Sequence, residues 1–186
     1  MTTFRGFIAI DIGASSKLIQ LENEIDKTGA NVKLVEPKNI HITLKFLGDA
    51  EEALIDEIET IMKNAVEGIN PFNIQLKGTG VFPNQNYIKV VWIGIDKGEQ
   101  IVDIARKIDE PLSKLGFEKE KREFSSHLTI ARVRSAKNKE QLVRVIEKYN
   151  ELEFADIKVD SITLKKSELT PKGPIYTTLK EIPLSG

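Results

Sequence analysis

Cysteine is absent from this chain of 186 residues. Its absence excludes a disulfide framework, a thiolate zinc site and a cysteine nucleophile. The chain also lacks any apolar run near the roughly 20 residues that a membrane-spanning helix needs, so we expect no membrane association. An excess of one charge is missing too, because 27 basic and 28 acidic residues leave a formal net charge of −1. A long nucleic-acid footprint usually needs a basic excess, so the composition argues against one but allows a site for one phosphate or strand end.

What the chain does contain is typical of a globular protein. Hydrophobic residues make up 40% and charged residues 30% of it, which predicts a single domain over residues 1–186 with a sizeable core. The opening stretch MTTFRGFIAIDIG carries Arg5 and Asp11 in its short apolar run, unlike a secretory signal peptide. We therefore expect a cytoplasmic protein. We also expect a monomer, because no segment has the pattern of an obligate interface.

Strand and helix patterns alternate along the chain. Period-two alternation indicates strands, and 3.6-residue spacing between polar caps indicates helices. The expected strands are 4–12, 31–36, 40–48, 72–82, 86–96, 126–133 and two regions near 152–166 and 174–180, and the expected helices are 15–29, 49–68, 97–116 and 137–150. In the second helix, Asp49 is the expected cap and Gly68 the expected end.

The two parts of the chain carry matching landmarks. FIAID at 7–11 resembles WIGID at 92–96, and NIQLK and SITLK form a second such pair. These landmarks predict an internal duplication with halves of roughly 1–90 and 91–186. The predicted fold class is α+β, with two pseudo-symmetric β-α-β lobes whose antiparallel sheets face a central cleft and whose helices lie on the outside.

The only two histidines, His41 and His127, lie in closely similar strand motifs. Both read His-aliphatic-Thr-aliphatic, as HITL and HLTI. Side chains at positions i and i+2 of a strand share a face, so His41 is expected beside Thr43 and His127 beside Thr129. Two such strands facing each other present two imidazoles and two hydroxyls to one space.

The same alternation assigns faces to the next residues of each strand. It puts Lys45 on the face of His41, and it puts Phe46 in the core. It turns Arg132 away from His127, which gives Arg132 a structural role unless a bulge intervenes.

Two facing imidazoles suit a reaction that removes one proton and adds another. An unperturbed histidine titrates near pH 6.5, so the neutral and protonated forms are both available near neutrality. One imidazole can activate the attacking oxygen while the other protonates the leaving oxygen, each contributing about 10²–10⁴-fold. Threonine hydroxyls can donate hydrogen bonds to the non-bridging oxygens of a phosphate. A strained cyclic phosphodiester is the substrate that fits this set best, because its ring needs no metal to open.

Two other interpretations of the motifs stay open. Histidines on strands are often structural, and SITLKK at 161–166 repeats the pattern of HITLKF without a histidine. Two histidines can also belong to a zinc site, but zinc needs a third and a fourth ligand. No carboxylate lies beside either motif at a spacing typical of a zinc ligand. We therefore expect no metal and no cofactor.

At these motifs the sequence resembles the two-histidine phosphoesterase superfamily, whose mark is a pair of His-x-Thr/Ser-x motifs. Within that superfamily the chain is similar to the RNA 2′,3′-cyclic phosphodiesterases, also called 2′-5′ RNA ligases. The segments that carry the resemblance over nearly the whole chain are RGFIAID, HITLKFLG, GVFP, VWIGI, HLTIARV and GPIYTTLKEIPL.

The resemblance implies a two-lobed α+β fold with a central cleft and a metal-independent activity. The implied reaction opens an RNA 2′,3′-cyclic phosphate to a 2′-phosphate, with 2′-5′ joining of RNA ends as a further activity. The implied partners are RNA ends or nucleotides that carry a 2′,3′-cyclic phosphate. The resemblance makes His41 the proton donor to the 3′ oxygen and His127 the base that activates water. It places Thr43 and Thr129 on the phosphate.

Five further residues are expected to bind substrate on weaker grounds. Arg5 and Phe7 share a predicted strand face that the resemblance turns toward the cleft, where they suit a phosphate and a base or ribose. Lys45 lies four residues after His41, so strand alternation puts it on the same face. Arg132 follows the second motif as in relatives of the family. Tyr176 is expected to line the cleft.

Functions of other classes compete with the enzyme. One alternative is a non-catalytic module that binds nucleotides or RNA ends in the same cleft, and another is a structural domain with two packed histidines. The charged stretch EKEKR at 118–122 precedes the second motif and is a candidate for steering RNA ends, although such a run is usually a solvated loop. Turnover of a cyclic phosphate separates the enzyme from both alternatives.

Overall fold

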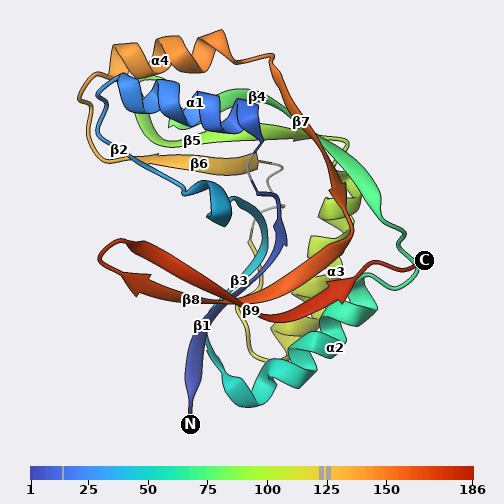
Figure 1. The fold of residues 1–186 in the computed structure, drawn as a ribbon. Coiled ribbons are helices and arrows are strands. Elements are labelled where there is room, and N and C mark those ends of the chain that lie inside the picture. Colours follow the sequence, from blue (N-terminus) through green and yellow to red (C-terminus); the bar gives the residue numbers. More distant parts are fainter. Residues whose placement is uncertain (14, 122–123, 125–126) are drawn as a thin grey trace.

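The structure is a computed structural model that describes residues 1–186 except 14, 122–123 and 125–126. The chain folds into two antiparallel sheets with helices on their outer sides (Figure 1). The strands are β1 (Thr3–Asp11), β2 (Val32–Leu34), β3 (His41–Glu51), β4 (Phe72–Asn84), β5 (Tyr87–Asp96), β6 (His127–Val133), β7 (Glu153–Val159), β8 (Ser161–Thr170) and β9 (Gly173–Pro183). The helices are α1 (Ser16–Lys27), η1 (Pro37–Asn39), η2 (Glu52–Leu54), α2 (Ile55–Ala65), α3 (Glu99–Lys114) and α4 (Lys139–Lys148).

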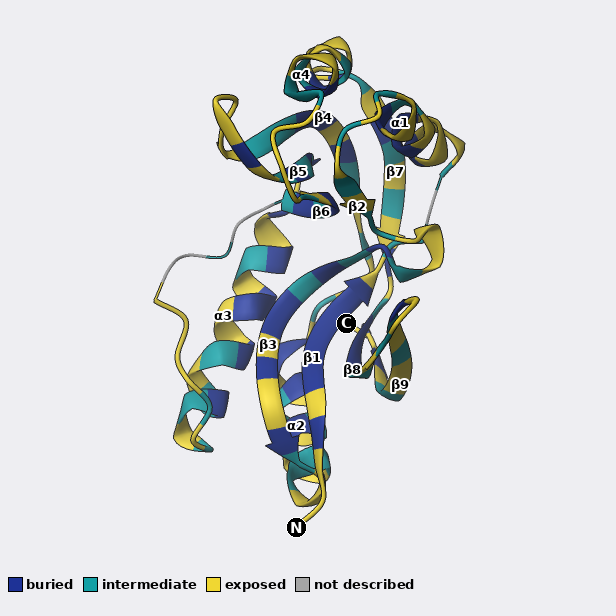
Figure 2. Cartoon of the chain, turned by 90° about the vertical axis from the view of Figure 1, so that its left-hand side faces the viewer, coloured by how far each residue is buried: buried dark blue, intermediate teal, exposed yellow. Residues whose placement is uncertain are grey.

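Each sheet and its helices form one lobe. The first sheet has the strand order β3-β1-β8-β9, and the second has the order β2-β6-β5-β4-β7. Helices α2 and α3 pack on the first sheet, and α1 and α4 pack on the second. Figure 2 shows the buried side of α3 turned toward β3. The predicted two-lobed α+β fold is confirmed.

Neither lobe coincides with one half of the sequence. In the first sheet, β1 pairs with β3 on one side and with β8, from the end of the chain, on the other. In the second sheet, β6 and β7 join β2, β4 and β5. The repeated landmarks nevertheless occupy equivalent places. FIAID in β1 and WIGID in β5 each lie beside a histidine-bearing strand, and SITLK in β8 and NIQLK in β4 lie on their other side. The strand orders of the two sheets fit two intertwined halves related by a pseudo-twofold axis. The internal duplication with halves of roughly 1–90 and 91–186 stays a prediction.

Local sequence accounts for where α1 begins and ends. The hydroxyl of Ser15 accepts a hydrogen bond from the backbone nitrogen of Leu18 at 3.3 Å, which caps the helix. Gly29 follows the helix with a φ of 71°, a left-handed conformation that glycine adopts without strain.

The predicted start of the second helix at Asp49 is wrong. Residues 49–51 extend β3 and pair with residues 3–5 of β1, so their backbone groups serve the sheet. The α2 helix begins only at Ile55, after the single 3₁₀ turn η2. Tertiary pairing with β1 therefore overrides the local helix signal in this segment.

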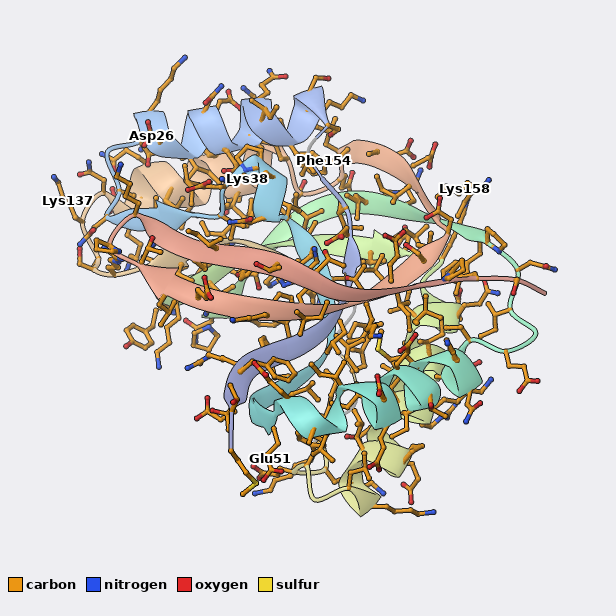
Figure 3. All side chains as sticks on the ribbon, turned by 60° about the horizontal axis from the view of Figure 1, so that its bottom comes forward. Asp26, Lys38, Glu51, Lys137, Phe154 and Lys158 are labelled. Atoms are coloured by element: carbon orange, nitrogen blue, oxygen red, sulfur yellow. The ribbon has the colours of Figure 1, made fainter. Side chains whose placement is uncertain are left out.

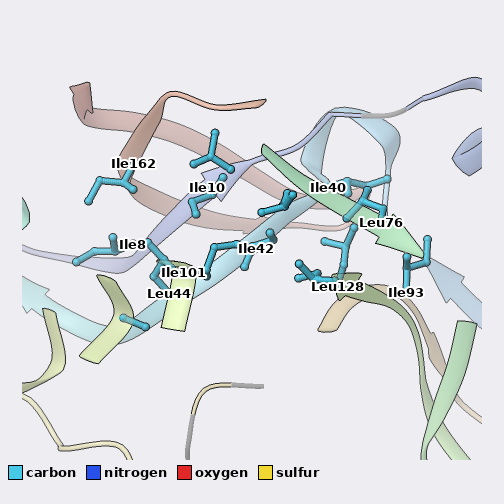
Figure 4. Close-up of a cluster of buried hydrophobic side chains, with 14 of the residues drawn as sticks. Ile8, Ile10, Ile40, Ile42, Leu44, Leu76, Ile93, Ile101, Leu128 and Ile162 are labelled. Carbon is cyan, nitrogen blue, oxygen red and sulfur yellow. The ribbon is translucent and has the colours of Figure 1, made fainter. Parts of the chain in front are cut away.

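The aliphatic residues of the two His-x-Thr motifs fix their strands in the core. Ile42 and Leu44 are 1% and 4% exposed, and Leu128 and Ile130 are 0% exposed. Figure 4 shows three of these side chains among buried aliphatic residues of both sheets. Because alternate side chains of a strand point to opposite faces, this burial turns each histidine and threonine away from the core.

The four α-helices within the described residues are short and amphipathic. The longest is α3, with 16 residues, and its buried residues Ile101, Ile104, Ile108 and Leu112 recur at helical spacing. No helix of the described part is long and apolar enough to cross a membrane.

Glu22 in α1 makes the stability of the fold depend on pH. It is buried, its Oε1 has no hydrogen-bond partner among the described residues, and burial raises the pKa of its carboxyl from 4.5 to about 7. The folded protein therefore holds this proton more tightly than the unfolded chain, so the free energy of unfolding falls as the pH rises from 4.5 through about 7. We expect Glu22→Gln to raise the free energy of unfolding by about 1–3 kcal/mol at pH 8 and by little at pH 4.5, as measured by urea denaturation.

The exposed Glu67→Gln exchange is the matched control, because it removes the same charge from the surface. An equal gain from Glu22→Gln at both pH values would contradict the assignment.

Candidate active site

The two His-x-Thr motifs begin strands β3 and β6, which belong to different lobes and contact each other. His41 pairs with Asp11 of β1, and His127 pairs with Gly94 of β5. Both imidazoles are partly buried, and so are the side chains of Thr43 and Thr129. The structure therefore places each predicted histidine and threonine on one face of its strand, the face opposite the core.

The hydrogen bonds of His41 determine which ring nitrogen is free to exchange a proton. Its Nδ1 lies 2.7 Å from the carbonyl oxygen of Asn39, which can only accept, so Nδ1 carries a hydrogen. In the neutral imidazole the lone pair is then on Nε2, which lies 3.0 Å from the hydroxyl oxygen of Thr43. The proton that His41 gains or loses is therefore the one on Nε2, beside the threonine.

Burial lowers the pKa of both imidazoles. For His41, burial lowers the pKa below 6.5, the Asn39 carbonyl and the Asp11 carboxylate raise it, and the Lys165 ammonium lowers it. Burial also lowers the pKa of His127 below 6.5. Both histidines are consequently poised to titrate on the acid side of their ordinary value.

Each imidazole packs against two aromatic rings. The ring centroid of His41 lies 4.9 Å from that of Phe7 and 5.4 Å from that of Tyr176. The ring centroid of His127 lies 4.1 Å from that of Trp92 and 5.1 Å from that of Phe82. These contacts hold the orientation of both imidazoles and give the site apolar walls that suit a ribose or a base.

A β-bulge in β3 reverses the faces after the first motif. Ala9 of β1 pairs with Thr43, but Ile8 pairs with Lys45, so Leu44 is the extra residue of the bulge. Lys45 is therefore buried, and its ammonium lies 2.7 Å from Asp109 on α3. The prediction that Lys45 shares the face of the first histidine is wrong.

Phe46 takes the place that strict alternation gave to Lys45. Its side chain is 66% exposed, and its ring centroid lies 6.5 Å from that of Phe7, so the prediction that it belongs to the core is also wrong. The sequence motif could not predict the bulge, because the bulge depends on the register between β3 and β1.

A matching bulge in β6 turns Arg132 toward the first lobe. Val91 of β5 pairs with Ala131, but Trp92 pairs with Thr129, so Ile130 is the extra residue. Arg132 is exposed, and its charge lowers the pKa of Tyr176 on β9, which burial raises. The alternation that turned Arg132 away from the second histidine is therefore overturned, and Arg132 joins the site between the lobes.

The remaining predicted residues are placed unequally. Phe7 is 4% exposed and contacts His41, and Tyr176 contacts both of them, so these two residues belong to the site. Arg5 is exposed and lies two residues before Phe7 in β1. Of the charged stretch 118–122, residue 122 lies outside the described residues, and the backbone carbonyl of Glu118 accepts a hydrogen bond from Lys45.

Lys165 and Asp11 lie beside His41, although no motif of the sequence predicts either of them as a site residue. Lys165 of β8 pairs with Phe7, and its ammonium lies 3.1 Å from the Asp11 carboxylate, beside His41. These two residues, with Asn39 and Tyr176, help to line a pocket of about 210 Å³. The stretch SITLKK carried no signal of its own, because only its pairing with β1 brings Lys165 to the histidine.

No group of three or more metal-ligating side chains occurs among the residues that the structure describes. The two strands supply two imidazoles and two hydroxyls, and Lys165 lies beside His41. The chemistry that these groups offer is acid–base and electrostatic.

Comparisons with known proteins agree on one family. A family model described as LigT like Phosphoesterase matches residues 10–92 and, separately, 93–176. The RNA 2′,3′-cyclic phosphodiesterase of Methanocaldococcus jannaschii is 45% identical over 179 residues, which cover 95% of this chain and 99% of the relative. That of Methanothermobacter thermautotrophicus is 39% identical over 178 residues, which cover 95% of this chain and 96% of the relative.

Solved structures share the fold. Protein TT0787 of Thermus thermophilus has a TM-score of 0.80 at 25% identity, with 98% of each chain covered. LigT of E. coli, solved in complex with 3′-AMP, has a TM-score of 0.77 at 21% identity, with 100% of each chain covered. Because the family model matches most of the sequence and both His-x-Thr strands are in place, the chain belongs to the LigT-like phosphoesterases, the two-histidine family that its motifs resemble.

Proposed function

We propose that this protein is a metal-independent RNA 2′,3′-cyclic phosphodiesterase that opens the cyclic phosphate of an RNA end to a 2′-phosphate. The observation that carries the proposal is the pair of His-x-Thr strands, one from each lobe, each with an imidazole beside a hydroxyl on the face opposite the core. Relatives that bear this name match the chain over 95% of its length.

The proposed reaction is an in-line attack of water on the cyclic phosphate. His127 takes a proton from the water as its oxygen bonds to phosphorus. The bond between phosphorus and the 3′ oxygen breaks, and His41 gives the proton on its Nε2 to that oxygen. The product is a 2′-phosphate with a free 3′ hydroxyl, and the two histidines exchange protonation states before the next turnover.

The assignment of His41 as the acid follows the resemblance to the family, and the surroundings of this residue support it. The Asn39 carbonyl and the Asp11 carboxylate both favour the protonated imidazole. In the protonated imidazole the Nε2 proton points toward Thr43. The acid and the hydroxyl are therefore close enough to contact the same phosphate.

The other site residues hold the substrate in this proposal. Arg132 and Lys165 stabilise the negative charge of the phosphate, and Thr129 donates a hydrogen bond from the second lobe. The rings of Phe7, Tyr176 and the exposed Phe46 contact the ribose and base. Arg5 lies farther along β1 and suits a neighbouring phosphate.

Two further expectations belong to the same proposal. The site also suits the joining of RNA ends through a 2′-5′ bond. In that step one imidazole takes the proton of the 5′ hydroxyl of a second RNA end as its oxygen bonds to phosphorus, and the other protonates the 3′ oxygen as its bond to phosphorus breaks. We propose that the protein acts as a cytoplasmic monomer. The alternative of a non-catalytic module keeps the same site but predicts binding of RNA ends without turnover.

Loss of either histidine is expected to abolish most of the activity. His41→Ala and His127→Ala should each lower kcat by at least about 100-fold, because each removes one proton-transfer step. EDTA should leave the wild-type rate unchanged. The assay uses an oligonucleotide that ends in a 2′,3′-cyclic phosphate, with identification of the product and thermal unfolding of each variant as the folding control. Equal rates in wild type and both variants would disprove the mechanism, and binding without product would favour the non-catalytic module.

The pH profile of kcat/KM is expected to peak on the acid side of pH 6.5. Because burial lowers the pKa of both histidines, His127 loses its role as base only at low pH, and His41 loses its acidic proton before neutrality is passed. Asp11→Asn removes a charge that raises the pKa of His41, so the alkaline limb should move to lower pH while the acidic limb stays.

The exposed Asp26→Asn exchange on α1, whose residue Figure 3 labels on the outside of the molecule, is the matched control and should leave both limbs in place. An optimum above pH 7, or an alkaline limb that ignores Asp11→Asn, would contradict the assignment of His41 as the acid.

A further inference from the structure

We propose that a basic pocket at the end of β6 binds a phosphate of the RNA chain several nucleotides away from its cyclic end. This basic pocket is defined by Lys89, Arg134, Lys137 and Lys139, with Tyr87 at its side. The proposal rests on the proposed function, because it extends the site of that substrate along the second lobe.

The charge of the basic pocket contrasts with that of the whole chain. Four cationic side chains line it, and no acidic side chain of the described residues does, although the chain as a whole has a net charge of −1. Lysines elsewhere, such as Lys148 and Lys180, lie against carboxylates. Uncompensated cations gathered at one pocket are the electrostatic signature of a phosphate-binding surface.

The backbone around the basic pocket is held in place. The ammonium of Lys139 donates to the carbonyl oxygen of Asn86 at 3.2 Å, which ties the start of α4 to the turn between β4 and β5. The Ser135 hydroxyl accepts from the backbone nitrogen of Lys137 at 3.3 Å and from the Asn31 side chain at 3.2 Å. An anion therefore meets a preformed loop, which lowers the entropic cost of binding.

An exposed aromatic ring lies at the basic pocket. Tyr87 is 62% exposed, and the ammonium of Lys89 lies 5.3 Å from the centroid of its ring. Cations next to an exposed ring are the combination that binds single-stranded RNA, since the cations contact the backbone and the ring stacks on a base. A free phosphate ion would use the cations only.

The position of the basic pocket relative to the histidines sets the length of RNA that reaches it. Arg132, which faces the first lobe, pairs with Val90, and the basic pocket begins with the next residue on each strand, at Val133 and Lys89. A strand rises about 3.3 Å per residue, so the basic pocket lies about 20 Å from His127 along β6. A mononucleotide bound at the histidines is too short to reach it, whereas a longer oligonucleotide is not.

The volume of the basic pocket agrees with a phosphate. It encloses about 100 Å³, which is small for a whole nucleotide. Figure 3 shows Lys137 at the outer end of the molecule. An RNA chain that passes the basic pocket can continue from there into solvent. The composition argues against a long RNA-binding surface. The structure instead gathers four basic side chains at one short surface, the basic pocket.

The experiment measures binding and hydrolysis separately. A fluorescent ten-nucleotide RNA that ends in a 2′-phosphate reports affinity without turnover, and a mononucleotide 2′,3′-cyclic phosphate reports the chemical step. The double variant Arg134→Ala/Lys137→Ala should weaken binding of the ten-nucleotide RNA by about tenfold at low salt. It should flatten the slope of log affinity against log salt by about 0.7, because the contact with one phosphate is lost. Hydrolysis of the mononucleotide should be unchanged.

Two controls sharpen the test. Lys107→Ala/Lys114→Ala removes two exposed cations from α3 in the other lobe and should leave the affinity within about twofold. Tyr87→Ala should weaken binding about fivefold with no change in the salt slope, because stacking carries no charge. If the two double variants behave alike, the basic pocket does not bind RNA. If wild type binds the RNA through the basic pocket but hydrolyses no cyclic phosphate, the proposed function fails while this binding site stands.

Discussion

The chemistry of the site depends on the alternation of side chains along β3 and β6, each of which has one face in the core. Ile42 in β3 and Leu128 in β6 are buried, so the imidazole and the hydroxyl of each motif share the opposite face. A slip of one residue in either strand would bury the histidine and expose the aliphatic residues. The free energy of core packing therefore also holds the proton-transfer groups in register.

The two bulges act on their strands in the same way. Each inserts one extra residue directly after the threonine of its motif, and the faces are reversed at the residues that follow it. In β3 the reversal buries Lys45 against Asp109 and exposes Phe46. In β6 it turns Arg132 toward the first lobe. The bulges thus expose the ring of Phe46 on the first lobe and turn the cation of Arg132 on the second lobe toward Tyr176.

The chain crosses between the two lobes more than once. Strands from the beginning and the end of the chain pair within the first sheet, and the second sheet mixes the halves in the same way. The two histidine-bearing strands are consequently tied together by several crossings of the chain rather than by one hinge. His127 and the basic pocket lie at opposite ends of the same strand, because β6 begins at His127 and its last residue, Val133, lines the pocket.

Local periodicity was enough to predict the strand motifs and the placement of each histidine beside a threonine, because these depend on which side chains avoid water. The two-lobed class was predicted from the repeated landmarks and from the resemblance to the family. The resemblance turned Phe7 toward the cleft, and Tyr176 was expected to line it; the structure places both rings against His41. The bulges, the burial of Lys45 and the approach of Lys165 to the site came from the folded sheets alone. Each of them depends on the register between strands far apart in the chain, and register is set by the packing of the whole sheet rather than by any one segment.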